Sequence, residues 1–274
     1  MLAKDDPFGS RGQGEFTFNL REAKLISPAA LVQLVAACYC LSMEGRPANI
    51  VVEDVGVRYY LKRSGFADAV ARVASITPSI EYSYSGHLRG SNYLLIEVTK
   101  IESGAALPDI LSRLIWVLRK RLKYRKFDAL DIATVVSEVC QNTFDHNHQT
   151  CGFIAMQVYK KDTPEEFVEI GIADYGDGLA ATLSRNKKNL PILSGTDAVL
   201  KATQLRVSAY DDPTRGTGLH HLLETTYKHD GSVQIRSGRG AVRFRWDKKQ
   251  GWRLDVPNMP GVQVTLTFPS KKRA

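Results

Sequence analysis

The chain has 274 residues, of which 43% are hydrophobic and 24% are charged, and it carries a formal net charge of +8. This composition is typical of a globular protein, and the length allows one large domain or two ordinary ones with a sizeable core. The longest apolar run, residues 29–43, is too short to span a bilayer, and residues 1–15 lack the apolar segment of a signal peptide, which argues against a membrane or secreted protein and favours a cytoplasmic one.

The first half of the chain alternates between strand and helix patterns. Residues 1–14 are polar and glycine-rich, so we expect a flexible leader. Strand patterns cover residues 15–20, 48–54 and 93–101, and helical patterns cover residues 28–44 and 56–73. Ser27 is placed to cap the first helix, Pro28 is at its first position and Gly45 ends it, whereas the second helix is broken near Gly65. This alternation predicts a sheet covered by helices.

The second half begins with two predicted helices. The first covers residues 110–124, apolar on one side and basic on the other, and Asp128 is the predicted cap of the second. Strands are predicted over residues 153–161, 167–174, 232–238, 241–247 and 261–269. A helix that starts at Gly218 is ended by Gly231, and residues 179–215 between these elements lack a strong period.

The basic residues are clustered, notably at residues 119–126 and 236–249. Such clusters can attract nucleic acid or acidic partners, but solvated surface explains them more simply, so nucleic acid is not the favoured partner. The cysteines have no spacing that suits zinc or a C-x-x-C motif, and free buried thiols in a reducing cytoplasm are predicted. They are Cys38, Cys40, Cys140 and Cys151.

The second helix of this half carries a polar row. In VVSEVCQNTFDHN, residues 135–147, Glu138, Asn142 and His146 recur at every fourth position and stack on one helical face. A carboxylate there can deprotonate a water molecule, and an amide oxygen one turn away suits Mg²⁺. The spacing E-x-x-x-N alone is explained as well by polar residues that face solvent.

A second motif, IADYGDGL, covers residues 172–179. An apolar strand ends in Asp174, and Gly176 and Gly178 follow. The carboxylate can accept a hydrogen bond from an exocyclic amine, and the glycines allow the backbone to approach a flat ring. An ordinary glycine-containing turn is the alternative.

A third motif, TRGTGLHHLL, covers residues 214–223. Gly216 and Gly218 come just before a helix, where free N–H groups and the helix dipole can bind an anion. Arg215 could add positive charge. A plain turn before a helix is again the alternative.

Together and in this order, the three motifs resemble the GHKL ATP-binding family, whose domains have the histidine kinase-like or Bergerat fold. The resemblance covers roughly residues 108–269, and the polar helix is most similar to the branch of the anti-sigma serine kinases. It implies that residues 108–274 form an α/β sandwich, a mixed sheet with helices on one face, within an α+β protein that uses ATP and Mg²⁺.

The resemblance implies a role for each matching position. Glu138 would be the general base, and Asn142 would bind the Mg²⁺ that bridges the phosphates. Asp174 would hold the adenine amine, and residues 179–215 would form the ATP lid. His146 could approach the phosphates or only cap its helix. The other implied ATP-binding residues are Gly176, Gly178, Arg215, Gly216, Thr217, Gly218 and Leu219.

Two features depart from the family pattern. Tyr175 follows the adenine aspartate, where the family often has asparagine, and Val262 follows Gly261, where a threonine hydroxyl usually joins the adenine network. Residues 239–260 exceed the usual turn and predict an extra hairpin bearing Trp246 and Trp252, for which structural packing is a simpler role than a partner surface.

Residues 15–102 resemble the STAS domain of anti-sigma antagonists, with Ser27 near the position of the phospho-acceptor. Because Pro28 follows and no Asp-Ser pair precedes it, a plain helix cap is the favoured role of Ser27. These resemblances imply ATP hydrolysis or phosphoryl transfer to Ser/Thr of a protein partner, in a regulatory partner-switching role. The alternative is an ATP-gated interaction module, for a protein or nucleic acid, with little turnover. Self-association is compatible with either.

Overall fold

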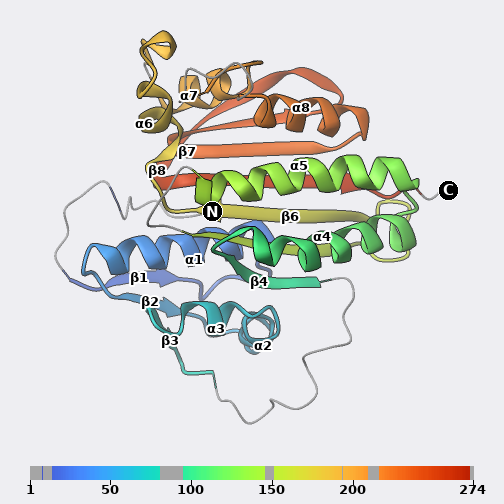
Figure 1. Ribbon diagram of the computed structural model, residues 1–274. Coiled ribbons are helices and arrows are strands. Elements are labelled where there is room, and N and C mark those ends of the chain that lie inside the picture. Colours follow the sequence, from blue (N-terminus) through green and yellow to red (C-terminus); the bar gives the residue numbers. More distant parts are fainter. Residues whose placement is uncertain are drawn as a thin grey trace.

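The computed structural model describes Phe8 and residues 14–80, 95–145, 151–192, 194–208 and 216–271. It is an α+β structure with a parallel three-stranded sheet and an antiparallel five-stranded sheet (Figure 1). Most of the predicted leader lies outside the described residues. None of the described helices has the length and apolar composition needed to cross a bilayer.

The parallel sheet pairs β1, β2 and β3 in that order. Its strands and neighbouring helices are β1 (Phe16–Asn19), α1 (Pro28–Met43), β2 (Ala48–Val51), α2 (Val55–Arg63), α3 (Phe66–Val70) and β3 (Ala74–Thr77). The cap of α1 is confirmed, because the Ser27 hydroxyl accepts a hydrogen bond from the Ala30 N–H. The helix predicted over residues 56–73 ends early, at Val70, and β3 follows without having been predicted.

The antiparallel sheet has the order β4-β5-β6-β8-β7. Its strands are β4 (Leu95–Ile101), β5 (Gly152–Tyr159), β6 (Phe167–Asp174), β7 (Ser232–Arg245) and β8 (Lys248–Pro269). Every pairing is antiparallel, so the expected mixed sheet is wrong. The strand predicted over residues 93–101 also changes partner, because β4 pairs with β5 rather than with the parallel strands.

The predicted hairpin of residues 239–260 is part of β7 and β8. Their register shifts near Gly238, which has a left-handed φ of +58°. The Trp246 N–H, just after β7, donates to the carbonyl of Gly231, just before β7, at 3.1 Å. The two ends of this strand are therefore close in space. The hairpin is paired within the sheet, but Trp246 and Trp252 are 54% and 40% exposed, so neither ring is buried in a core.

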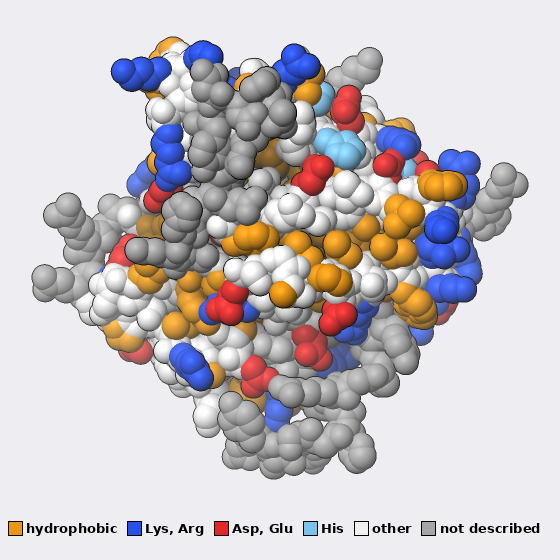
Figure 2. All heavy atoms as spheres, viewed as in Figure 1, with side chains coloured by type: hydrophobic (Ala, Val, Ile, Leu, Met, Phe, Trp, Pro, Cys, Tyr) orange, Lys and Arg blue, Asp and Glu red, His pale blue; other side chains and the backbone are white. Residues whose placement is uncertain are grey.

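One face of the five-stranded sheet carries α4 (Leu107–Trp116), α5 (Lys126–Asp145) and α8 (Gly218–Lys228). The helix predicted over residues 110–124 changes into a π-helical turn at Val117–Arg121. Because α5 begins at Lys126, Asp128 lies inside its first turn and pairs with Arg125 at 2.8 Å instead of capping the helix. Figure 2 shows this face, on which basic side chains gather at one end of α4 and α5.

The other face of the five-stranded sheet is partly covered by α1, which lies between the two sheets (Figure 1). Side chains of β5 alternate, so Phe153 packs in the core around α1 and Ile154 in the core around α5. The approach is closest at Gly171 of β6, where an added Cβ would lie 2.5 Å from the Ala29 Cα. The first half of the chain is therefore fixed directly to the sheet of the second.

The four cysteines are free thiols, as predicted. Burial raises the pKa of Cys38 and Cys140 to about 12, so both thiols stay protonated and unreactive. Cys40 is only half-buried, because it lies on the side of α1 that turns away from the core.

Candidate functional site

A cavity of about 330 Å³ lies between α5, the ends of β6 and β8, and the start of α8. All three sequence motifs contribute to its lining. The predicted site residues that line it are Glu138, Asn142, Asp174, Gly178, Gly216, Thr217, Gly218 and Leu219. Gly176 is not among the lining residues, but its N–H donates to Asp174 Oδ1 at 2.9 Å. His146 and Arg215 lie outside the described residues.

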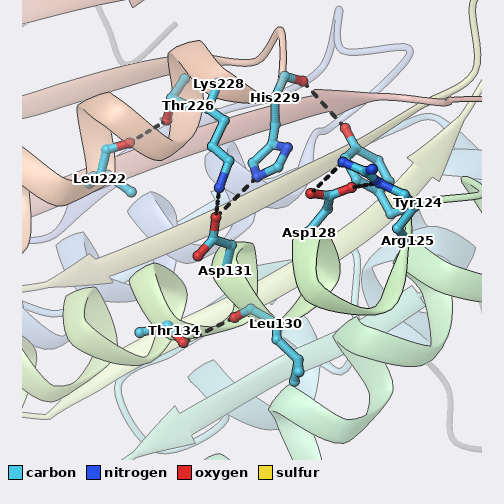
Figure 3. Close-up of polar contacts among 10 residues, drawn as sticks. All are labelled: Tyr124, Arg125, Asp128, Leu130, Asp131, Thr134, Leu222, Thr226, Lys228 and His229. Atoms are coloured by element: carbon cyan, nitrogen blue, oxygen red, sulfur yellow. Dashed lines mark hydrogen bonds and ion pairs between the residues drawn. The ribbon is translucent and has the colours of Figure 1, made fainter.

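Helices α5 and α8 are held together by polar contacts at one end (Figure 3). Asp131 of α5 pairs with Lys228 and lies 3.6 Å from His229 Nε2. The hydrogen bond from Lys228 lowers the pKa of Asp131, and burial lowers the pKa of His229. This cluster fixes α8 along α5 and thereby sets the position of its first residue, Gly218.

Gly218 brings the glycine loop of the third motif against the polar row of α5. A Cβ added to Gly218 would lie 3.5 Å from Glu138 Oε2 and 3.8 Å from Asn142 Nδ2. The N-terminal N–H groups of α8, the Glu138 carboxylate and the Asn142 amide therefore share one end of the cavity. The φ of Gly216 is +82°, and an added Cβ would lie 2.5 Å from the Val207 carbonyl, so the loop needs glycine there.

Glu138 has a neighbour that the sequence motifs did not indicate. Its Oε2 is buried without a hydrogen-bond partner and lies 3.4 Å from His221 Nδ1, one turn into α8. A carboxylate oxygen that no other group occupies can accept a proton. The signal in the sequence was a histidine one turn after a glycine, which is too common to identify a site.

At the other end of the cavity, Asp174 is almost completely buried. Its Oδ1 accepts hydrogen bonds from the Gly176 N–H at 2.9 Å and the Val262 N–H at 3.2 Å. Burial raises the pKa of this carboxyl group to about 6, although both N–H groups oppose the rise. Val262 therefore joins this network through its backbone, without the hydroxyl group of a threonine.

Ser237 of β7 connects the turn that follows β6 with the turn at Gly261, and both turns lie beside Asp174. Nothing in the sequence indicates this role. Its hydroxyl accepts from the Leu179 N–H at 2.8 Å and donates to the Gly261 carbonyl at 2.9 Å. A Cβ on Gly178 would lie 2.8 Å from this hydroxyl, and a Cβ on Gly261 would lie 2.2 Å from the Asp174 carbonyl. Both glycines have positive φ, so this corner of the cavity requires them.

The cavity has an apolar part and a polar part. Its apolar walls come from Ile172, Leu179, Leu183, Val262 and Val264. These walls adjoin Asp174, whereas the amide, the carboxylate and the loop glycines gather at the other end. The cavity thus offers apolar contacts and a carboxyl group at one end, and helix N–H groups at the other.

A metal ion fits this cavity only together with an anionic ligand. The described residues contain no cluster of three His, Cys, Asp or Glu side chains that could hold a metal by themselves. The Asn142 amide offers one oxygen ligand, and Mg²⁺ commonly takes its remaining ligands from phosphate and water.

Tyr175 points away from the cavity. Its ring lies 5.6 Å from that of Tyr39 on α1 and 6.2 Å from that of Phe153 on β5. The side chains of Asp174 and Tyr175 therefore lie on opposite faces of the sheet.

Comparison with known proteins gives no independent assignment: no family model, no curated protein and no solved structure matches this chain.

Proposed function

We propose that the cavity binds ATP together with Mg²⁺, as its resemblance to the GHKL family implies. The adenine ring lies between the apolar walls with its amine on Asp174, and the phosphates meet the first N–H groups of α8. Asn142 holds the metal ion, which neutralises phosphate charge. The observation that carries the proposal is that three motifs far apart in the sequence line one cavity. The hydrogen-bond acceptor for an amine lies at one end of the cavity and the N–H groups that can bind an anion lie at the other. This separation corresponds to the adenine and phosphate ends of ATP.

The reaction that this site supports best is phosphoryl transfer with Glu138 as general base. Phosphoryl transfer depends mainly on positioning and on neutralising charge. Glu138 lies beside the anion-binding end, where it can take a proton from water or from a serine or threonine hydroxyl group of a partner. His221 Nδ1 lies 3.4 Å from this carboxylate.

The acceptor in a kinase reaction is another protein rather than Ser27 of the same chain. In a STAS-like first half, Ser27 would be near the acceptor position. Here its hydroxyl caps α1, which packs on the face of the sheet opposite α5 and Glu138. The sheet therefore separates Ser27 from the base, which supports a partner-switching role toward a separate protein.

Calorimetric titration with ATP and Mg²⁺ tests binding. We expect saturable heat that the Asp174→Ala substitution reduces, and absence of heat with the unmodified chain would refute the proposal.

Incubation with γ-labelled ATP, with and without cell extract, then separates the reactions. Label on a protein indicates a kinase, and label in free phosphate alone indicates an ATPase. Binding without either product indicates an ATP-gated interaction module, the alternative function.

A further inference from the structure

The sheet face opposite the ATP cavity is only partly covered by α1. Beside α1, side chains of β7 and β8 line a second cavity of about 600 Å³, here termed the back-face groove. Its polar lining includes Gln33 of α1, Thr265 of β8, and Gln234, Arg236 and Arg243 of β7. None of these residues lines the proposed ATP site, so the groove is a separate site.

The groove continues to an exposed aromatic ring. Arg243 is the cross-strand partner of Trp252, so both side chains lie on the same face of the sheet. The Trp252 ring centroid lies 6.0 Å from the guanidinium carbon of Arg245 and 5.7 Å from Lys248 Nζ. Trp252 nevertheless remains 40% exposed, so a ligand can reach it.

We propose that the back-face groove and Trp252 bind a short segment of single-stranded nucleic acid. Guanidinium groups pair with phosphate through two parallel hydrogen bonds, which suits the exposed Arg243 to a phosphate backbone. A tryptophan ring stacks on any base. The carboxamides of Gln33 and Gln234 each offer a donor and an acceptor to the edge of an unpaired base.

The charges of Arg236, Arg243 and Glu169 set the orientation of the nucleic-acid strand in the groove. Arg236 is 7% exposed, and its Nη2 donates to the Pro257 carbonyl at 2.6 Å, which fixes its guanidinium group. Glu169 lies at the α1 end, where it accepts the Ala29 N–H at 3.3 Å. Because this carboxylate repels phosphate, the phosphates lie toward Arg236 and Arg243, and a base reaches Trp252.

An acidic protein or a duplex fits this face less well. The register places two exposed large apolar side chains here, Trp252 and Leu254, whereas a protein interface has a more extensive apolar centre. A duplex keeps its bases stacked on one another and offers no free base to the Trp252 ring.

Fluorescence anisotropy of a labelled single strand of about 12 nucleotides, titrated with the full chain, tests the proposal. We expect binding that weakens between about 50 and 200 mM salt and that quenches tryptophan fluorescence. Trp252→Ala and Arg243→Glu should each weaken binding at least about tenfold, because each removes a stacking or phosphate contact. Trp252→Phe, which keeps a ring, should retain most of the affinity.

Trp246→Ala is the matched control, because it removes another exposed tryptophan from the same hairpin. Its affinity should stay within about twofold, and a duplex of the same sequence should bind at least about tenfold more weakly. Three results would overturn the proposal: no binding at low salt, equal binding of the duplex, or binding that Trp252→Ala and Arg243→Glu leave unchanged. Urea denaturation of each variant shows whether it is folded, and because this site does not use the ATP cavity, either proposal can fail alone.

Discussion

The two faces of the five-stranded sheet are built from the same strands but covered differently. On one face, α5 presents Glu138 and Asn142 to a cavity that α8 closes. On the other, α1 is buried on nearly all sides and packs so closely that Gly171 has no room for a side chain. Both helices are long and lie along the sheet, but the space beside α5 lies at the ends of β6 and β8, whereas the space beside α1 lies over β7 and β8.

The difference shows where polar groups cost stability in this fold. On the α5 face, Asp174 is buried with a raised pKa, and a carboxyl group in that environment is retained at the expense of stability. On the α1 face, contact is apolar and close, which is what stability alone favours. Substitutions on the α5 face should therefore change ligand binding and turnover, and substitutions under α1 should change folding.

The largest effect is expected from Glu138→Gln. It keeps the size of the side chain but removes the proton acceptor, so turnover of ATP should fall by at least about 100-fold while ATP still binds. Phosphate release and calorimetry measure the two quantities. Glu224→Gln, an exposed glutamate of α8, is the matched control, and equal turnover in both variants would remove Glu138 from the mechanism.

Asp174→Asn should change how stability depends on pH. Because burial raises the pKa of Asp174 to about 6, the folded chain keeps this proton at pH values where the unfolded chain has lost it. The stabilisation is present below about pH 4 and is lost as the pH rises through about 6. The free energy of unfolding of Asp174→Asn relative to the unmodified chain should increase over this range by up to about 3 kcal/mol. Urea denaturation across the range measures it, and a constant difference would contradict the assignment.

Gly171→Ala tests the opposite face. The new Cβ would meet the backbone of Ala29 at 2.5 Å, so α1 must shift, at a cost of about 2 kcal/mol in the free energy of unfolding. Gly104→Ala is the control, because an added Cβ there meets nothing within 4 Å. Thermal denaturation that gives the same midpoint for both variants would show that α1 is not closely packed.

The smallest effect is expected from Asp131→Asn, which loosens α8 from α5. Asp131 is partly exposed, so losing its contacts with Lys228 and His229 should lower the free energy of unfolding by about 1 kcal/mol or less. ATP affinity should fall slightly, since these contacts help to position Gly218. Asp109→Asn, in the first turn of α4, provides the comparison in the same denaturation and titration experiments. A larger loss of affinity in the control would refute the positioning role.

Much of this arrangement could be predicted from the sequence where local rules decide it. The cap and first position of α1 at Ser27 and Pro28 depend on neighbouring residues only. Strand positions in the second half followed from alternation and turns, and the three motifs could be placed within a helix, at a strand end and at a helix start.

Features that depend on distant contacts could not be predicted. The partner of β4, the antiparallel order of the sheet and the position of α1 are set by packing between halves of the chain. Ser237 and His221 could be identified near the site only from the structure, which places them beside Gly261 and Glu138 respectively. A serine in a strand or a histidine on a helix has no sequence pattern that marks it as a site residue.

The consecutive positions of Asp174 and Tyr175 have a mechanical consequence. One side chain lines the cavity, and the next stacks on Tyr39 of α1 across the sheet. A rotation of the backbone at this junction would move both side chains, because consecutive residues of a strand point to opposite faces. A ligand that rotates the backbone at Asp174 would therefore also shift the Tyr175 ring against Tyr39.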